Sequence, residues 1–166
     1  MNTQRSHTFT WEDPQPHVAA GRQMSGLEYM QSIFRGEMPL APIAVLMNMR
    51  GAEIEEGRLV FEAEPGEMHL NPIGLVHGGF AATILDSAMG CVVHTLLPQG
   101  MMYSTIQINV HYVRPVMPGQ GVLRCEARAL HQGRQMATAS AELRDMAGKL
   151  YAHGTSACSI FPLPQS

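Results

Sequence analysis

The chain has 166 residues, of which 45% are hydrophobic and 15% are charged, which indicates one globular domain with a sizeable core. Its net charge of −3 arises from 11 basic and 14 acidic residues without long blocks of one sign. We therefore expect no nucleic-acid partner, because nucleic-acid-binding proteins carry a basic patch. The three cysteines form no C-x-x-C pair and lie among apolar residues, which is typical of reduced thiols and predicts a cytoplasmic protein.

The first part of the chain shows no apolar periodicity. Residues 1–23 are rich in proline and polar side chains, and we expect a flexible arm there without a secretory signal. A capping box that begins at Ser25 and an apolar stripe over residues 27–34 predict a short helix. We expect a single domain over residues 24–162, followed by a C-terminal tail over residues 163–166.

Strand-like segments surround one long apolar run. The run over residues 79–97 predicts a long helix. Alternation and turn signals predict strands at residues 43–50, 58–64, 105–112, 122–130, 135–145 and 150–160. The first two strands form a hairpin around Glu56 and Gly57, and strict alternation in the third places Thr105 on the face opposite Ile106. Since an almost wholly apolar helix must be covered on all sides, we expect an α+β fold in which an antiparallel sheet of about six strands wraps around it.

Asp86 is the only formally charged side chain between Gly78 and Leu97. This segment has the length of a membrane span, but a central carboxylate makes insertion costly, so we expect a buried core helix and no membrane partner. A carboxylate in such surroundings is disfavoured unless it is paired, solvated or needed. Asp86 is therefore a catalytic candidate, and the alternative is a structural carboxylate hydrogen-bonded in a dimer core.

Gly78 and Gly79 stand where a loop becomes the long helix. The amino end of a helix presents unpaired N–H groups, which stabilise an oxyanion such as the one formed in acyl transfer. The alternative is a tight turn without a ligand. Asp86 lies eight residues beyond Gly78, about 12 Å along one helix, so one chain cannot aim both at one carbon. A shared site then requires a second subunit, which predicts a two-fold dimer.

Two further candidates precede the helix. Asn71 lies in a loop with proline and glycine, where its amide is able to orient water or a carbonyl, although an Asn there is more often a turn residue. His77 is a candidate general base, with the alternative that its ring bonds to the backbone and holds the loop. The remaining histidines and cysteines lack metal-ligand spacing, and we expect no metal site.

The pattern N-x5-H-G-G-x6-D, followed by Tyr-Val-Arg-Pro at residues 112–115, resembles the hotdog-fold acyl-CoA thioesterases, specifically the PaaI-like family of the phenylacetate pathway. The resemblance covers roughly residues 25–161. It implies a hotdog fold and hydrolysis of an acyl-CoA to free acid and CoA between two subunits, without metal or redox cofactor. It also implies a homodimer or a homotetramer built as a pair of dimers.

The resemblance implies a role for each matching residue. It implies that Asp86 is either the nucleophile or the general base for water, and the choice between these two roles stays open. It makes Gly78 the oxyanion donor and places the hydroxyl of Thr105 near the attacking water. Arg114 and Arg134 are candidates for the CoA phosphates, or are solvated surface charges. A hotdog-fold hydroxyacyl dehydratase and a noncatalytic acyl-CoA-binding protein are the alternatives. The sequence does not give the acyl group or the metabolic pathway.

Overall fold

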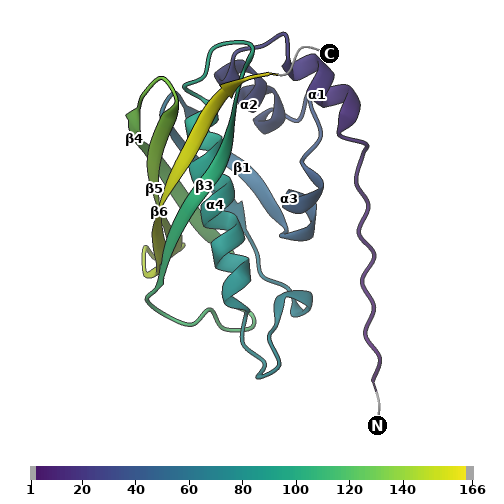
Figure 1. Cartoon of the computed structure of the whole chain (residues 1–166). Helices are drawn as coiled ribbons and strands as arrows, with labels where there is room; N and C mark the ends of the chain where they lie inside the picture. Colours follow the sequence, from purple (N-terminus) through teal and green to yellow (C-terminus); the bar gives the residue numbers. More distant parts are fainter. Residues whose placement is uncertain (1–2, 164–166) are drawn as a thin grey trace.

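The computed structural model describes residues 3–163. Its helices are α1 Gln15–Gly21, α2 Gly26–Phe34, α3 Pro42–Leu46, the 3-10 turn η1 Glu67–His69 and α4 Gly78–His94. Its strands are β1 Met49–Glu55, β2 Arg58–Ala63, β3 Met101–Tyr112, β4 Leu123–Gln132, β5 Met136–Asp145 and β6 Leu150–Pro162. The strands form one antiparallel sheet in the order β1-β2-β4-β5-β6-β3, and Figure 1 shows this sheet curving around α4. The predicted sheet-around-helix architecture is confirmed.

The central helix α4 is buried around most of its circumference. Its fully buried side chains include Ile84, Leu85 and Met89. Three of the four buried side chains of β5 are alanines, Ala137, Ala139 and Ala141, so the helix lies close to the sheet there. An apolar helix is stable here because sheet and helices together remove its surface from water.

The amino-terminal region differs in part from the prediction. Within the predicted arm, residues 15–21 form the helix α1, where Pro16 occupies an early helical position that suits its fixed φ. The capping box at Ser25 is confirmed, since its hydroxyl accepts from the Glu28 N–H and the Glu28 carboxylate accepts from the Ser25 N–H. Residues 164–166 of the predicted tail lie outside the described residues. The division into arm, domain and tail stays a prediction.

The strand predicted at residues 43–50 is wrong. Pro42 begins the short helix α3 instead, because proline is preorganised for the first helical turn. Asn48 then adopts a φ of 48°, which ends the helix, and β1 starts at Met49. The hairpin around Gly57 is confirmed, with β1 and β2 paired from Glu55 and Arg58 outward.

A β-bulge in β3 changes which residues face the helix. Thr105 pairs with Cys158, whereas Gln107 pairs with Ala157, so Ile106 is an extra residue in the ladder. Thr105 therefore points to the α4 side and Gln107 to the outer face. Strict alternation through this segment, which put both residues on one face, is wrong because a bulge reverses the facing of the residues before it.

Candidate functional site

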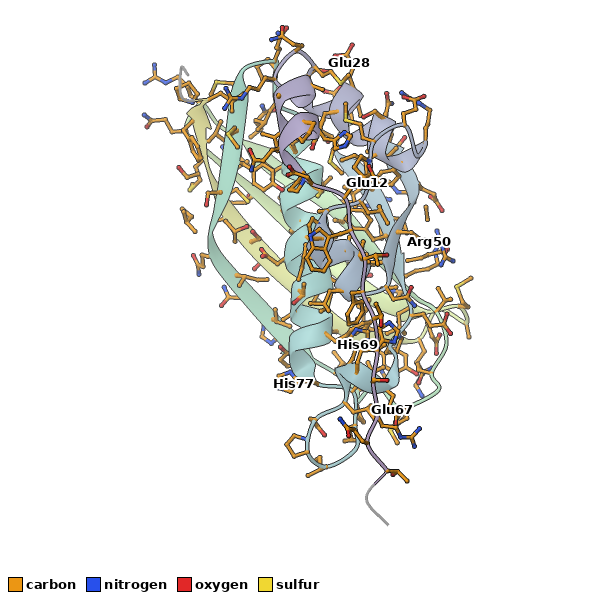
Figure 2. All side chains as sticks on the ribbon, turned by 90° about the vertical axis from the view of Figure 1, so that its right-hand side faces the viewer. Glu12, Glu28, Arg50, Glu67, His69 and His77 are labelled. Atoms are coloured by element: carbon orange, nitrogen blue, oxygen red, sulfur yellow. The ribbon has the colours of Figure 1, made fainter. Side chains whose placement is uncertain are left out.

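His77 caps the amino end of α4, at the lower end of that helix in Figure 2. Its ring Nδ1 accepts from the Gly79 N–H at 2.8 Å. Because Nδ1 accepts, the neutral ring carries its proton on Nε2, where it is a donor rather than a base. This geometry favours the alternative in which His77 holds the loop. The same hydrogen bond occupies the Gly79 N–H, which is then not available to a ligand.

The Gly78 N–H has no hydrogen-bond partner among residues 3–163. It lies in a cavity of about 220 Å³ at the start of α4, which we call the helix-start cavity, together with His77, Tyr112 and Arg114. A Cβ on residue 78 would lie 3.3 Å from the Tyr112 ring, so glycine keeps this N–H approachable. A free donor at a helix amino end suits a developing oxyanion.

The loop before α4 is held by its own polar groups. Asn71 Oδ1 accepts from the N–H groups of Ile73 and Leu75, both at 3.1 Å, which supports its interpretation as a turn residue. Buried His69 donates from Nε2 to the Leu46 carbonyl at 2.9 Å while its Nδ1 accepts from the Gly66 N–H, and its own carbonyl accepts from the His77 N–H. His69 thus anchors the loop that positions the helix start.

Asp86 lies at the middle of α4 and accepts a hydrogen bond from Thr105 Oγ1 at 3.0 Å. The bulge in β3 makes this contact possible because it turns Thr105 inward. The bond uses Oδ1, and no hydrogen bond from residues 3–163 reaches Oδ2. One carboxylate oxygen is therefore fixed and the other is open to a water or a substrate.

Asp86 and Thr105 open into a cavity of about 380 Å³, which we call the α4 cavity. Its walls come from α2, α3, β1, β2, α4 and β3, and they are mostly apolar. Burial raises the pKa of the Cys91 thiol to about 11, raises the pKa of Tyr103 well above its usual value and lowers that of His94. These three polar side chains of the wall are therefore uncharged near neutral pH.

The two halves of the predicted site lie in different cavities of one chain. Asp86 is in the α4 cavity, whereas Gly78 and Arg114 are in the helix-start cavity. Arg114 also donates to the Leu150 carbonyl at 2.6 Å. Arg134 lies in the β4–β5 turn, two residues after Gln132, whose side-chain amide donates to the Leu96 carbonyl beyond the carboxyl end of α4. One chain therefore places the two arginines at opposite ends of α4.

A larger hollow of about 630 Å³ lies on the outer face of the sheet, away from these residues. Charged side chains that line it pair with one another, as Arg128 does with Glu126 and Arg144 with Glu142. Such exposed pairs are typical of a solvated sheet face. The smaller apolar cavity with a carboxylate is the better candidate site.

Comparison with known proteins identifies the family. Residues 73–152 match the family described as the thioesterase superfamily. Acyl-coenzyme A thioesterase 13 of Homo sapiens is 31% identical over 99 residues, which cover 59% of this chain and 69% of that protein. The chain belongs to the thioesterase superfamily. It is accordingly a thioester hydrolase, as the motif around Asp86 predicted.

Two solved structures are similar to this chain. A phenylacetic acid degradation-related protein from Ralstonia eutropha JMP134 is 30% identical, with a TM-score of 0.72 over 79% of this chain and 98% of that one. Protein smu.793 from Streptococcus mutans UA159, bound to acetyl CoA, is 22% identical, with a TM-score of 0.63 over 71% of this chain and 92% of that one. The first supports the predicted PaaI-like relationship, and both share the hotdog fold.

Several side chains of this thioesterase line the α4 cavity without having been predicted for the site. They are Tyr29, Phe61, His94 and Tyr103. Tyr103 was detectable in principle, because it lies two residues before Thr105 on the same inward face. The others come from elements distant in sequence, so no local pattern brings them together.

Within residues 3–163, no group of three or more His, Cys, Asp and Glu side chains is arranged to hold a metal ion. No helix in the same part of the chain is long and apolar enough to cross a membrane.

Proposed function

We propose that this protein hydrolyses acyl-CoA thioesters to the free acid and CoA. The observation that carries the proposal is the Asp86 carboxylate, which is fixed by Thr105 and lines an apolar cavity in a chain of the thioesterase superfamily. The substrate class is supported by relatives named acyl-coenzyme A thioesterase 13 and by related structures that contain acetyl CoA or coenzyme A.

In the proposed reaction the thioester carbonyl carbon is attacked, its oxygen becomes an oxyanion and the C–S bond then breaks to release the CoA thiolate. Asp86 either takes a proton from the attacking water or attacks the carbonyl itself and is then released by water. The open Oδ2 suits both roles. The Gly78 N–H stabilises the oxyanion, and such a donor typically lowers the barrier by about 2.7–4 kcal/mol.

The proposed active site is shared between two subunits. About 12 Å of helix separates Gly78 from Asp86, and the two residues open into different cavities of one chain. A two-fold partner that brings its own Gly78 to Asp86 resolves this separation. Each dimer then holds two sites, and each site takes its carboxylate from one subunit and its oxyanion donor from the other.

Strand β3 is the proposed dimer contact. It is a 12-residue edge strand, so one row of its backbone groups has no partner strand within the described chain. Large apolar side chains on it are exposed, with Ile106 61% and Tyr112 56% exposed. Long apolar edges invite strand pairing. Antiparallel pairing of two β3 strands would bring the carboxyl end of α4 in one subunit toward the amino end of α4 in the other.

That arrangement also gives the predicted arginines a common role. Arg114 lies beside the helix start and Arg134 beyond the opposite end of α4, so antiparallel pairing would bring Arg114 of one subunit nearer to Arg134 of the next. Both are proposed to contact the CoA phosphates. Asn71 and His77 are proposed to hold the loop and the helix start, and Gly79 to let the thioester approach closely.

The test is thiol release from acetyl-, hexanoyl-, decanoyl-, palmitoyl- and phenylacetyl-CoA by the native protein, Asp86→Asn and the matched control Glu56→Gln. Glu56 is exposed in the β1–β2 turn, so its substitution removes a carboxylate without touching the site. Hydrolysis by the native protein and by Glu56→Gln, with most of the rate lost in a folded Asp86→Asn, supports the proposal. Acyl-CoA binding without thiol release by the native protein would contradict it and favour a noncatalytic role.

A further inference from the structure

The α4 cavity follows one face of its helix from the middle to the carboxyl end. Asp86, Cys91 and His94 line it in that order along α4. At 1.5 Å per residue, the eight residues from Asp86 to His94 span about 12 Å. Strand β3 runs alongside, with Thr105 bonded to Asp86 and with the Tyr103 hydroxyl 4.0 Å from Cys91 Sγ. The cavity therefore has a catalytic end and a far end.

Three rings form the far end, which we call the aromatic floor: Tyr29, His94 and Tyr103. The His94 ring centroid lies 5.8 Å from that of Tyr29, edge to face, and 5.5 Å from that of Tyr103. Gly90 makes room for the third ring, because a Cβ there would lie 2.6 Å from Tyr103 Cε2. The three rings of the aromatic floor come from α2, α4 and β3, so the floor forms only when these elements pack together.

A second cavity of about 110 Å³ lies on the other side of this floor. Tyr29 and His94 line both cavities, and Arg22 with Met24 closes the second one from the segment before α2. The His94 ring makes no hydrogen bond within residues 3–163, and its buried Nδ1 has no partner there. The ring thus separates two cavities without being tied to either wall by a polar contact.

We propose that the acyl chain lies in the α4 cavity with its thioester carbon at Asp86, and that His94 is the specificity-determining residue that limits the length of this chain. The inference rests on the proposed acyl-CoA hydrolysis and names its substrate class, aliphatic acyl groups of medium length. An extended chain advances about 1.2 Å per bond, so 12 Å accommodates about ten carbons. The volume agrees, since 380 Å³ holds roughly a dozen groups of about 30 Å³ each.

The acyl chain meets little charge along this path. Apart from Asp86 at the catalytic end, Arg50 is the only formally charged side chain among residues 3–163 that lines the cavity, and it is exposed at the surface. Figure 2 shows Arg50 at the outer edge of the molecule, pointing away from α4. Burial favours the neutral forms of His94 and Tyr103. An alkyl chain therefore gains apolar contact along the whole cavity, about fourfold in kcat/KM for each methylene that is buried.

The test compares kcat/KM over straight-chain acyl-CoAs from two to sixteen carbons for the native protein, His94→Ala and the matched control His94→Phe. The native value should rise to about ten carbons and fall beyond. His94→Ala joins the two cavities, and the added 110 Å³ should extend the limit by about four carbons. His94→Phe keeps a ring and loses no hydrogen bond, so it should keep the native limit.

A second variant covers the case in which His94→Ala fails to fold. Cys91 lies five residues beyond Asp86, about 7.5 Å along the cavity, so Cys91→Leu should shorten the limit to about six carbons. Decanoyl-CoA should then lose at least tenfold in kcat/KM relative to butyryl-CoA. Folded His94→Ala and Cys91→Leu proteins whose length profiles match that of the native protein would overturn the inference.

Binding of free fatty acids of graded length, followed by calorimetry, separates the inference from the proposed function. A length limit in fatty-acid binding that His94→Ala extends, without any thioester hydrolysis, supports the cavity assignment and refutes the hydrolase proposal. Hydrolysis that depends on Asp86 but not on acyl length supports the proposed function and refutes the role of His94.

Discussion

The sharing of each site between two subunits predicts that two inactive variants restore activity when they are mixed. Gly78→Pro removes the proposed oxyanion donor, since proline has no N–H. The helix should survive, because proline suits the first helical position and the His77 ψ of 139° suits a residue before proline. Asp86→Asn removes the carboxylate charge with little change of shape.

The expected loss of activity in each variant, and its recovery in the mixture, follow from the sharing of each site between two subunits. Homodimers of Gly78→Pro should lose about 10²–10³-fold in kcat, the usual cost of one oxyanion donor. A mixed dimer holds one site with both lesions and one site with neither, because each site draws Gly78 and Asp86 from different subunits. Random pairing makes about half of the dimers mixed, so the mixture should recover about one quarter of the native activity.

The assay is thiol release from a medium-chain acyl-CoA after the two variants have been refolded together, with the share of mixed dimers measured by native mass spectrometry. The matched control mixes native protein with the double variant. A shared site leaves only native homodimers active, about one quarter of the full rate, whereas a site within one subunit leaves about half. Mixed dimers that form but show no more activity than the separate variants would refute the shared site.

Other predictions concern single residues. Gly26→Ala should cost about 3 kcal/mol or more and lower Tm by about 10 °C, because its Cβ would lie 1.8 Å from the His94 carbonyl oxygen; a melt within about 2 °C of native contradicts this. Thr105→Val should lower kcat about 10- to 100-fold through loss of its bond to Asp86, with Thr105→Ser near native; equal rates for both would show that the hydroxyl is not needed. Burial lowers the pKa of His94 from 6.5, so native stability in urea should be full above pH 6.5 and fall as the pH drops below that value, because the unfolded chain binds the proton first; His94→Phe should flatten this decline. The native Cys91 thiol, with its pKa raised to about 11, should react slowly with a thiol dye near pH 8, whereas all three cysteines should react after unfolding in guanidinium.

Local patterns were sufficient wherever a short-range interaction decides the structure. The capping box at Ser25 is complete within four residues, and it begins α2 as predicted. The apolar run of α4 required cover on all sides, and the predicted strands around it made a surrounding sheet the expected cover. Asp86 was recognisable for the same reason, as a charge that an apolar helix would not carry without a partner.

Sequence patterns were misleading where a single residue changes the geometry. The apolar segment around Ile43 resembles a strand, but Pro42 makes it a helix. The alternation in β3 contains no sign of the bulge at Ile106, which depends on the register against β6. That bulge decides that Thr105 faces Asp86, so the most specific contact of the candidate site follows from strand pairing.

By itself, the sequence determined the fold class and the family, because the periodicity of each element and the spacing of the motif are local patterns. Only the tertiary structure decided that His77 holds the Gly79 N–H, that Asp86 and Gly78 open into separate cavities, and that rings from α2, α4 and β3 close the α4 cavity. The physical reason is distance along the chain. Cavities form where side chains from remote elements fail to fill the space between them, and no local periodicity contains that information.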